Sequence, residues 1–407
     1  MISPGQGSRN LTALTAASFI GFAGFTLVMP FLPLYIAQLG ERDFGSIAAW
    51  TGISLGITPA ITALLAPVWG RLADRVGRKF LVARSLFSFI VIMAAMAYVA
   101  HPWQLLALRI VQGLFAGYGA LCLAMAADSA PSDRIARSIG MVQTAQRLGP
   151  ALGPVVGGVV AGLVGLRNAF LVTACFYAVA LAQLLVLYRE PRLATHGTAA
   201  RQARVTFRNV LAFENFVVLM AVIFGFQFVD RSLGPVLPLY VAALGVSPGR
   251  VALLSGLVFS ILACGAAFGH HLGARMLRRL TARAMIGRAA PIAAAAVALF
   301  AIVPGPWTLA LAAAVFGVAV GSAMTSAYAA AAATMPAELR GTGFGLLTSA
   351  SLVGIAVSPM ISGFVAATDM RIVFLADAVI LCIVALSVRH VMVDSPAPAA
   401  APTVEEC

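Results

Sequence analysis

The chain has 407 residues, of which 61% are hydrophobic and only 10% are charged, and its mean hydropathy is +0.97. So few charges cannot cover the water-facing surface of a soluble protein of this length, and the composition therefore indicates an integral membrane protein. The net charge of +13 could suggest a nucleic-acid-binding protein, but the Lys and Arg residues stand between apolar runs and not on one basic face. We therefore expect no nucleic-acid partner and interpret the basic residues as topology signals.

Apolar runs of about 20 residues, each long enough to cross a bilayer, occur twelve times. They lie at approximately 11–37, 46–69, 80–100, 103–127, 138–163, 167–188, 215–241, 250–272, 285–304, 307–333, 342–366 and 371–393. The first run is too long for a signal-peptide core and is interpreted as a retained membrane helix. An Arg-rich polar stretch follows the sixth run, and an Ala/Pro-rich tail follows the twelfth. The predicted organisation is a six-helix bundle over 1–188, a cytoplasmic linker over 189–213, a second six-helix bundle over 214–393 and a disordered cytoplasmic tail over 394–407.

The second half of the chain repeats the first. The segment PFLPLYIAQLG, which begins at Pro30, reappears as PVLPLYVAALG 205 residues later. Three residues of the fifth run recur at the same offset, since Gly149, Pro154 and Gly158 match Gly354, Pro359 and Gly363. Six helices, an even number, separate equivalent segments, so both copies cross the membrane in the same direction. The fold prediction is an all-α membrane protein of twelve transmembrane helices in two parallel six-helix repeats.

The distribution of basic residues predicts the orientation. With a cytoplasmic N-terminus, 20 of the 27 Lys and Arg residues fall on the cytoplasmic side and only four fall outside. Both termini are therefore expected in the cytoplasm. The excess of Arg over Lys and the abundance of Ala favour a GC-rich bacterium, so the expected location is a bacterial cytoplasmic (inner) membrane, which the chain crosses many times.

A stripe of glycines marks the fifth run. Gly149, Gly153 and Gly157 are four residues apart, so on a helix they form a face without side chains, against which another helix can pack backbone to backbone. Pro150 and Pro154 each remove a backbone donor and are expected to bend this helix.

Three motifs resemble those of a known family. The loop Gly70-Arg-Leu-Ala-Asp74-Arg75-Val-Gly77-Arg78-Lys79 resembles the signature loop of the major facilitator superfamily. The run Gly149-x-x-x-Gly153-Pro154-x-x-Gly157-Gly158 matches the antiporter motif of that superfamily at every fixed position, and Leu105-x-x-x-Arg109-x-x-Gln112-Gly113 resembles its fourth-helix motif with a buried arginine. With the segment LVMPFLPLY from Leu27, the chain is most similar to the twelve-helix drug/proton antiporter branch, of the multidrug and tetracycline-resistance exporter type.

The resemblance implies where gating and binding occur. It assigns gating to Gly70, Asp74, Arg75, Gly77 and Arg78 of the loop and to Gly149, Gly153, Pro154, Gly157 and Gly158 of the fifth helix. It places Asp74 against the start of the eleventh helix, near 341–345, when the cytoplasmic side is closed. It also implies a central cavity between the first, fourth, seventh and tenth helices, with a seam formed by the fifth and eighth helices and by the second and eleventh.

Asp230 is the strongest candidate for coupling. It precedes Tyr240 by ten residues, or roughly 15 Å of helix, which places it near mid-membrane, where a charge costs at least ~2.5 kcal/mol and usually has a function or a partner. Arg231 points about 100° away around the helix, so an ion pair between these neighbours is not automatic. We predict that Asp230 is the proton-coupling carboxylate. Asp377 in the last helix is the second candidate, although it could simply pair with Arg371 near the outer interface.

The rest of the expected cavity is apolar, with Phe25, Met29 and Phe226 among its lining residues. Arg109 and Arg147 are the candidate cavity cations, unless they snorkel to an interface. The first run contains no acid, whereas many antiporters of this kind carry one there, so coupling is expected to use the second half. The predicted function is export of small lipophilic compounds, cations among them, in exchange for protons by alternating access. The alternative is an uncoupled or differently coupled facilitator or uptake transporter of the same fold.

An enzyme is the competing class. Gly52-Ile-Ser54-Leu-Gly56 has the spacing of a nucleophile elbow, but it lies within a continuous apolar run and has no candidate base nearby. No HExxH motif is present, and the sole lysine, Lys79, does not belong to a P-loop. We therefore expect no catalytic residue, no metal and no cofactor. The expected partners are a small-molecule substrate, protons and the lipid bilayer, with the chain acting as a monomer.

Overall fold

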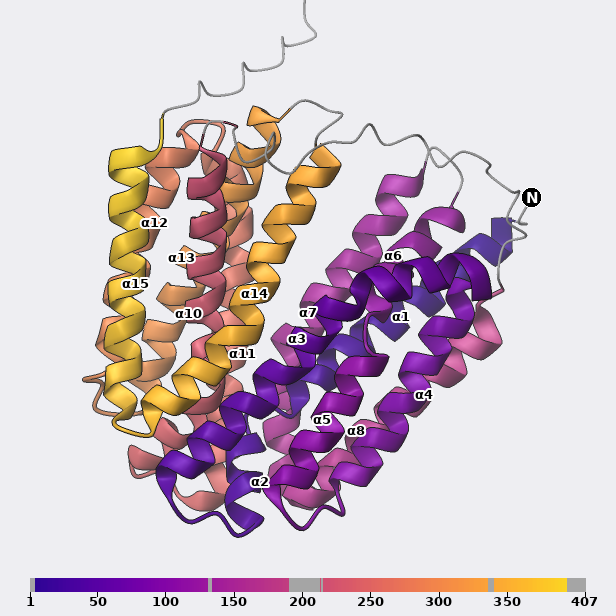
Figure 1. Cartoon of the computed structure of the whole chain (residues 1–407), viewed down its shortest axis with the longest axis horizontal. Coiled ribbons are helices and arrows are strands. Elements are labelled where there is room, and N and C mark those ends of the chain that lie inside the picture. Colours follow the sequence, from indigo (N-terminus) through magenta and orange to yellow (C-terminus); the bar gives the residue numbers. More distant parts are fainter. Residues whose placement is uncertain (1–3, 131–133, 190–212, 214, 336–339, 394–407) are drawn as a thin grey trace, which may run out of the picture. The chain divides into compact units, whose positions relative to one another are not determined.

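The computed structural model describes residues 4–130, 134–189, 213, 215–335 and 340–393 (Figure 1). All regular elements in this part are helices. In the first half they are α1 (Pro4–Leu27), α2 (Leu32–Gln38), α3 (Phe44–Val76), α4 (Arg78–Met96), α5 (Pro102–Phe115), α6 (Tyr118–Asp128), α7 (Ile135–Val164) and α8 (Leu166–Leu187). In the second half they are α10 (Phe216–Ala243), α11 (Pro248–Met276), α12 (Ala282–Phe300), α13 (Pro306–Thr334), α14 (Arg340–Ala366) and α15 (Met370–Val391).

Twelve candidate membrane spans lie within the described residues, and each corresponds to one predicted run. The prediction of twelve membrane helices is therefore confirmed. Two runs differ in detail. The first ends at Leu27 and continues after a turn as the short helix α2, and the fourth is divided into α5 and α6. The division occurs at Gly117, whose φ of +105° is a left-handed conformation that glycine adopts without strain.

The chain forms two compact units. Unit 1 comprises Met1–Thr198, Ser232–Ser260 and Ala356–Met370, and unit 2 comprises Ala199–Arg231, Ile261–Ile355 and Arg371–Cys407. The predicted boundaries at 188 and 214 remain a prediction. Nearly all of the predicted linker and the whole predicted tail, 190–212 and 394–407, lie outside the described residues.

The glycine stripe of α7 packs against α1 in unit 1. A Cβ atom on Gly149 would lie 2.7 Å from the backbone nitrogen of Ala23, and one on Gly157 would overlap the carbonyl oxygen of Leu27. Gly153 is similarly close to the backbone of Ala23. Only residues without a side chain allow this approach, so the prediction of backbone-to-backbone packing is confirmed.

Unit 1 also contains two helix contacts that are equivalent under the repeat. A Cβ atom on Gly256 of α11 would overlap the carbonyl oxygen of Pro154 in α7, and a Cβ atom on Gly52 of α3 would overlap that of Pro359 in α14. Gly256 follows Gly52 by 204 residues and Pro359 follows Pro154 by 205. These are the two helix pairs that were predicted to form the seam. In each pair a glycine of one helix packs against the carbonyl oxygen of a proline in the other.

The repeat extends to contacts that lie within different units. Gly149 in unit 1 approaches the carbonyl oxygen of Phe19, and its counterpart Gly354 in unit 2 approaches that of Phe224, again 205 residues on. Because equivalent glycines face equivalent carbonyl groups, the duplication governs the packing of the helices as well as the sequence.

Candidate functional site

Arg109 is a buried cation inside unit 1. Its side chain, on α5, is 1% exposed, so it does not snorkel to an interface. Its Nη1 atom donates a hydrogen bond to Oε1 of Gln112 at 3.0 Å. The Nε and Nη2 atoms of Arg109 and the Nε2 atom of Gln112 have no hydrogen-bond partner among the described residues. Buried donors of this kind are costly unless water or a ligand satisfies them, so this pair is a candidate polar contact for a bound molecule.

Aromatic side chains gather in the same unit. The hydroxyl group of Tyr177 on α8 donates to the carbonyl oxygen of Gly21 on α1 at 3.1 Å. The ring of Phe89 lies 5.3 Å from that of Tyr177 and 5.9 Å from that of Tyr118, measured between centroids. Phe22 packs on Tyr118 as well, at 5.7 Å. Neither tyrosine was predicted from the sequence, where the one signal was the position of Tyr118 directly after Gly117.

The break between α5 and α6 is stabilised by side chains from α3 and α4. The carbonyl oxygen of Phe115, at the end of α5, accepts hydrogen bonds from Oγ of Ser85 at 2.6 Å and from Nη2 of Arg84 at 3.2 Å. The guanidinium carbon of Arg84 lies 3.8 Å from the centroid of the Trp69 ring. A carbonyl freed by a helix break within a membrane needs such partners, and broken helices line the substrate sites of many transporters.

Asp230 lies in the middle of α10, within unit 2. Its Oδ2 atom is 3.2 Å from Nε of Arg231, with exposed side-chain fractions of 16% for Asp230 and 30% for Arg231. The two neighbours do form an ion pair, because the long arginine side chain can turn back over its own helix. One turn earlier, Nε2 of Gln227 donates to Oγ of Ser351 on α14 at 2.9 Å. A partly exposed carboxylate with a cationic partner thus lies in the middle of a candidate membrane helix, and its depth in the bilayer stays a prediction.

The other predicted cavity residues differ in exposure. Phe226 is completely buried in unit 2, Met29 is 9% exposed in unit 1, and Phe25 is intermediate. Arg147 is exposed. Asp377 on α15 is only 2% exposed, so it is shielded from solvent more completely than Asp230 is.

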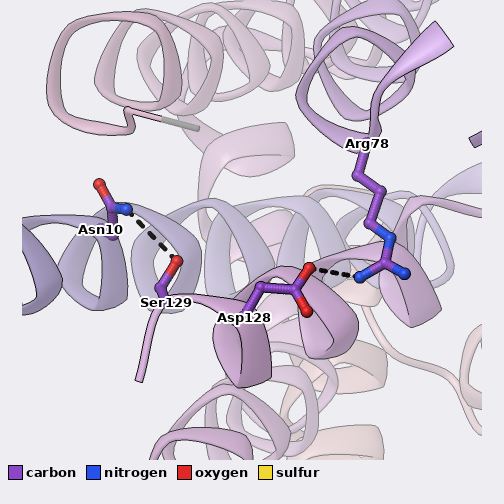
Figure 2. A network of polar contacts seen from close by, with 4 residues as sticks. All are labelled: Asn10, Arg78, Asp128 and Ser129. Carbon is purple, nitrogen blue, oxygen red and sulfur yellow. Dashed lines mark hydrogen bonds and ion pairs between the residues drawn. The ribbon is translucent and has the colours of Figure 1, made fainter. Parts of the chain in front are cut away.

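The predicted gating loop joins α3 to α4 at Gly77, whose φ is +91°. Gly70 and Arg75 are exposed on α3. Asp74 belongs to the last turn of α3, but its side chain lies outside the described residues. Arg78, the first residue of α4, forms an ion pair with Asp128 at the end of α6 (Figure 2).

A polar network accompanies this ion pair at the same end of unit 1. Asn10 donates through Nδ2 to Oγ of Ser129 at 3.3 Å (Figure 2) and to the carbonyl oxygen of Arg189 at 2.8 Å. The backbone N–H of Arg189 donates back to Oδ1 of Asn10 at 2.9 Å. Neither Asp128 nor Asn10 was predicted from the sequence. The signal for Asp128 was its rarity, since Asp133 is the only other acid between Asp74 and Glu190.

Twelve candidate membrane helices, equivalent glycine contacts in the two halves and charged side chains held within the helices define a duplicated multi-pass membrane protein. The chain belongs to the Major Facilitator Superfamily, whose family model matches residues 14–306 and 289–406. It is therefore a membrane transporter by family and fold, and not an enzyme.

Two relatives are proteins named multidrug resistance protein MdtG. The one from Proteus mirabilis is 30% identical over 253 residues, which are 62% of this chain and 63% of the relative, just under two thirds of its length. The one from Enterobacter lignolyticus is 29% identical over 380 residues, which are 93% of this chain and 91% of the relative. Among solved structures, a bacterial homolog to the human lysosomal transporter Spinster, in an inward-facing and occupied conformation, matches with a TM-score of 0.83 and 19% identity, covering 95% of this chain and 97% of that one. This last similarity supports the fold alone.

Proposed function

We propose that the protein is a secondary transporter that exports small lipophilic compounds, cations among them, in exchange for protons by alternating access. Its family and its similarity to proteins named for multidrug resistance support export. The observation that carries the proposed coupling is Asp230, a partly exposed carboxylate in the middle of a membrane helix, paired with Arg231 at 3.2 Å.

The chemistry of the Asp230 carboxylate supports antiport in which proton and substrate exclude each other. A carboxylate that binds a proton loses its attraction for any cation, and a bound cation in turn favours the ionised carboxylate. Proton and cationic substrate therefore compete for Asp230. If the proton enters from outside and leaves to the cytoplasm, each turnover exchanges a proton for a substrate cation at Asp230. Whichever of the two is bound shifts the equilibrium between the outward-open and inward-open states.

Arg109 has a separate proposed role in unit 1. Its two unsatisfied nitrogens and the Gln112 amide can donate to an oxygen of a bound molecule. The rings of Tyr118 and Tyr177 are buried in the same unit. A few polar donors among aromatic residues are typical of small-molecule sites.

Transport by Asp230→Asn tests the coupling. Proteoliposomes loaded with a labelled lipophilic cation, tetraphenylphosphonium, would be measured with an imposed pH gradient and in downhill exchange without one. We expect Asp230→Asn to abolish gradient-driven accumulation and to retain downhill exchange. Asp369→Asn, which removes an exposed acid from the loop between α14 and α15, is the control and should behave like the unaltered protein.

The two modes also distinguish the alternatives. Full gradient-driven transport by Asp230→Asn would move the coupling role to Asp377. An unaltered protein whose transport ignores the pH gradient would instead be a facilitator, the second candidate function.

We also propose that the chain acts as a monomer in a bacterial inner membrane with both termini in the cytoplasm, as the basic residues indicate. A cysteine at position 78, introduced as Arg78→Cys, should react with a membrane-impermeant maleimide only after the cells are opened. Labelling from outside intact cells would contradict this topology.

A further inference from the structure

A groove lies between α12 and α15 in unit 2, away from the residues discussed above. These two helices are neighbours at one edge of the unit (Figure 1), and Nη2 of Arg283 on α12 donates to the carbonyl oxygen of Arg389 on α15 at 2.6 Å. The groove has a volume of about 660 Å³, within the range of about 300–1,000 Å³ that is common for ligand pockets.

Small residues create the hollow. Ala284 and Gly287 line it on α12, and Ala385 lines it on α15. A Cβ atom on Gly287 would have no neighbour within 4 Å. The groove is also long, because it reaches Pro291, nine residues into α12 from its start, or roughly 13 Å at 1.5 Å per residue.

The groove opens on the apolar outside of unit 2. The large exposed side chains of α15 recur every three or four residues and so share one face: Ile372, Leu375, Val379, Ile383 and Leu386, each 46–58% exposed. Leu386 itself lines the groove. In a membrane-spanning helix such a face meets lipid acyl chains, so a lipid can reach the groove directly from the bilayer.

One end of the groove is strongly basic. Arg283 lies in the first turn of α12, Arg389 in the last turn of α15, and Arg288 one to two turns deeper. Arg288 and Arg389 are exposed, and neither side chain forms an ion pair within the described part of the chain. The Arg283 guanidinium covers a carbonyl group at the C-terminal end of α15, which would otherwise repel an anion. No acidic residue lines the groove among the residues that the structure describes.

We infer that this groove binds an anionic phospholipid. Its phosphate lies between Arg288 and Arg389, and an acyl chain follows the small residues past Gly287 toward Pro291. Basic pockets between membrane helices recognise anionic headgroups in this way. The apolar part of the groove, from Gly287 to Pro291, favours a lipid over a soluble phosphate because only a lipid has an acyl chain to bury there. Under the predicted orientation, the lipid belongs to the cytoplasmic leaflet.

Lipid binding to the purified full-length protein tests the inference. Native mass spectrometry would compare phosphatidylglycerol with zwitterionic phosphatidylethanolamine. We expect phosphatidylglycerol to bind more tightly than phosphatidylethanolamine. The double variant Arg288→Gln/Arg389→Gln should lose affinity for phosphatidylglycerol by roughly 30-fold, because each basic residue near a membrane surface contributes about 5-fold to the affinity for an anionic lipid. The control Arg278→Gln/Arg279→Gln removes two other exposed arginines of unit 2 and should change affinity less than about 3-fold. Equal losses in both variants would show general electrostatic attraction and overturn the site.

The apolar part needs its own test. Gly287→Leu should fill the groove and weaken phosphatidylglycerol binding, whereas Gly140→Leu, at another helical glycine with open space around it, should not. Unchanged binding by Gly287→Leu would refute the proposed path of the acyl chain. Displacement of the lipid by millimolar glycerol phosphate would indicate a site for a free anion and refute a lipid site.

The unaltered protein provides a further measurement if a variant does not fold. Cys382 lines the groove, whereas Cys175 and Cys264 are exposed elsewhere. Phosphatidylglycerol should slow alkylation of Cys382 by N-ethylmaleimide and leave the other two unaffected. Equal protection of all three, or of none, would contradict the inference.

Discussion

Gly256 of α11 lies directly against the carbonyl oxygen of Pro154 in α7, at a distance that leaves no room for a side chain. Because the neighbour is backbone, it cannot move aside as a flexible side chain would. Gly256→Val should therefore separate α7 from α11 and destabilise unit 1 by about 1–3 kcal/mol, the usual cost of overpacking. The thermal midpoint of the purified protein measures this effect.

The same helix offers a matched control. A Cβ atom on Gly249 would have no neighbour within 4 Å, so Gly249→Val should leave the midpoint almost unchanged. Gly52→Val should destabilise as Gly256→Val does, since Gly52 meets Pro359 in the equivalent contact. A harmless Gly52→Val would show that the two halves do not share this packing.

The ion pair of Asp230 and Arg231 gives a second prediction. Removing either partner leaves the other charge within a membrane helix, which costs more than removing both. In a double-mutant cycle of Asp230→Asn and Arg231→Gln, the double variant should be more stable than the sum of the single effects predicts, by about 0.5–3 kcal/mol. Strictly additive losses in thermal stability would show that the pair contributes nothing.

The length of the apolar runs, the 205-residue repeat and the glycine spacing were sufficient to predict the twelve helices, the duplication and the backbone-to-backbone packing of the fifth run, but not that α1 is the partner of α7. They could not predict the break at Gly117, because a single glycine in an apolar run does not show whether its φ is positive. The ion pair of Arg78 with Asp128 joins residues 50 positions apart, and such a distance carries no local pattern. The contacts of Arg84 with Trp69 and with the Phe115 carbonyl could not be predicted either, because a charge count registers the charge of an arginine but not the direction of its long side chain.

The environment of Arg84 gives a third prediction. Arg84→Lys keeps the charge but loses the planar group that stacks on Trp69 and donates to the Phe115 carbonyl. We expect a loss of about 1–2 kcal/mol in stability and a shift in tryptophan fluorescence. In a Trp69→Leu background the same change should cost less, because the stacking partner is already gone. An equal loss of stability in both backgrounds would show that the stacking on Trp69 contributes nothing and that only the hydrogen bond to the Phe115 carbonyl matters.

A fourth prediction concerns Arg78 and Asp128. Arg78→Asp and Asp128→Arg each place two like charges together at the end of unit 1 shown in Figure 2, so each should reduce transport of the labelled cation. The combined Arg78→Asp/Asp128→Arg variant restores opposite charges and should recover transport. If the combined variant transports no better than the single ones, the ion pair is not what these residues contribute.

The last prediction concerns Asp74, in the final turn of α3. The C-terminal end of a helix disfavours an acid, because the macrodipole is negative there, so the carboxylate needs a partner from elsewhere. The family resemblance assigns Asp74 to gating, and the N-terminal amides of another helix would favour its negative charge. If this contact forms only in the state closed to the cytoplasm, it sets the balance of access states and does not bind substrate. Asp74→Asn should then reduce transport severely while the dissociation constant for the labelled cation stays within about 3-fold, less than the 5- to 150-fold range of typical allosteric coupling. A parallel fall in binding and transport would place Asp74 in the substrate site and not in the gate.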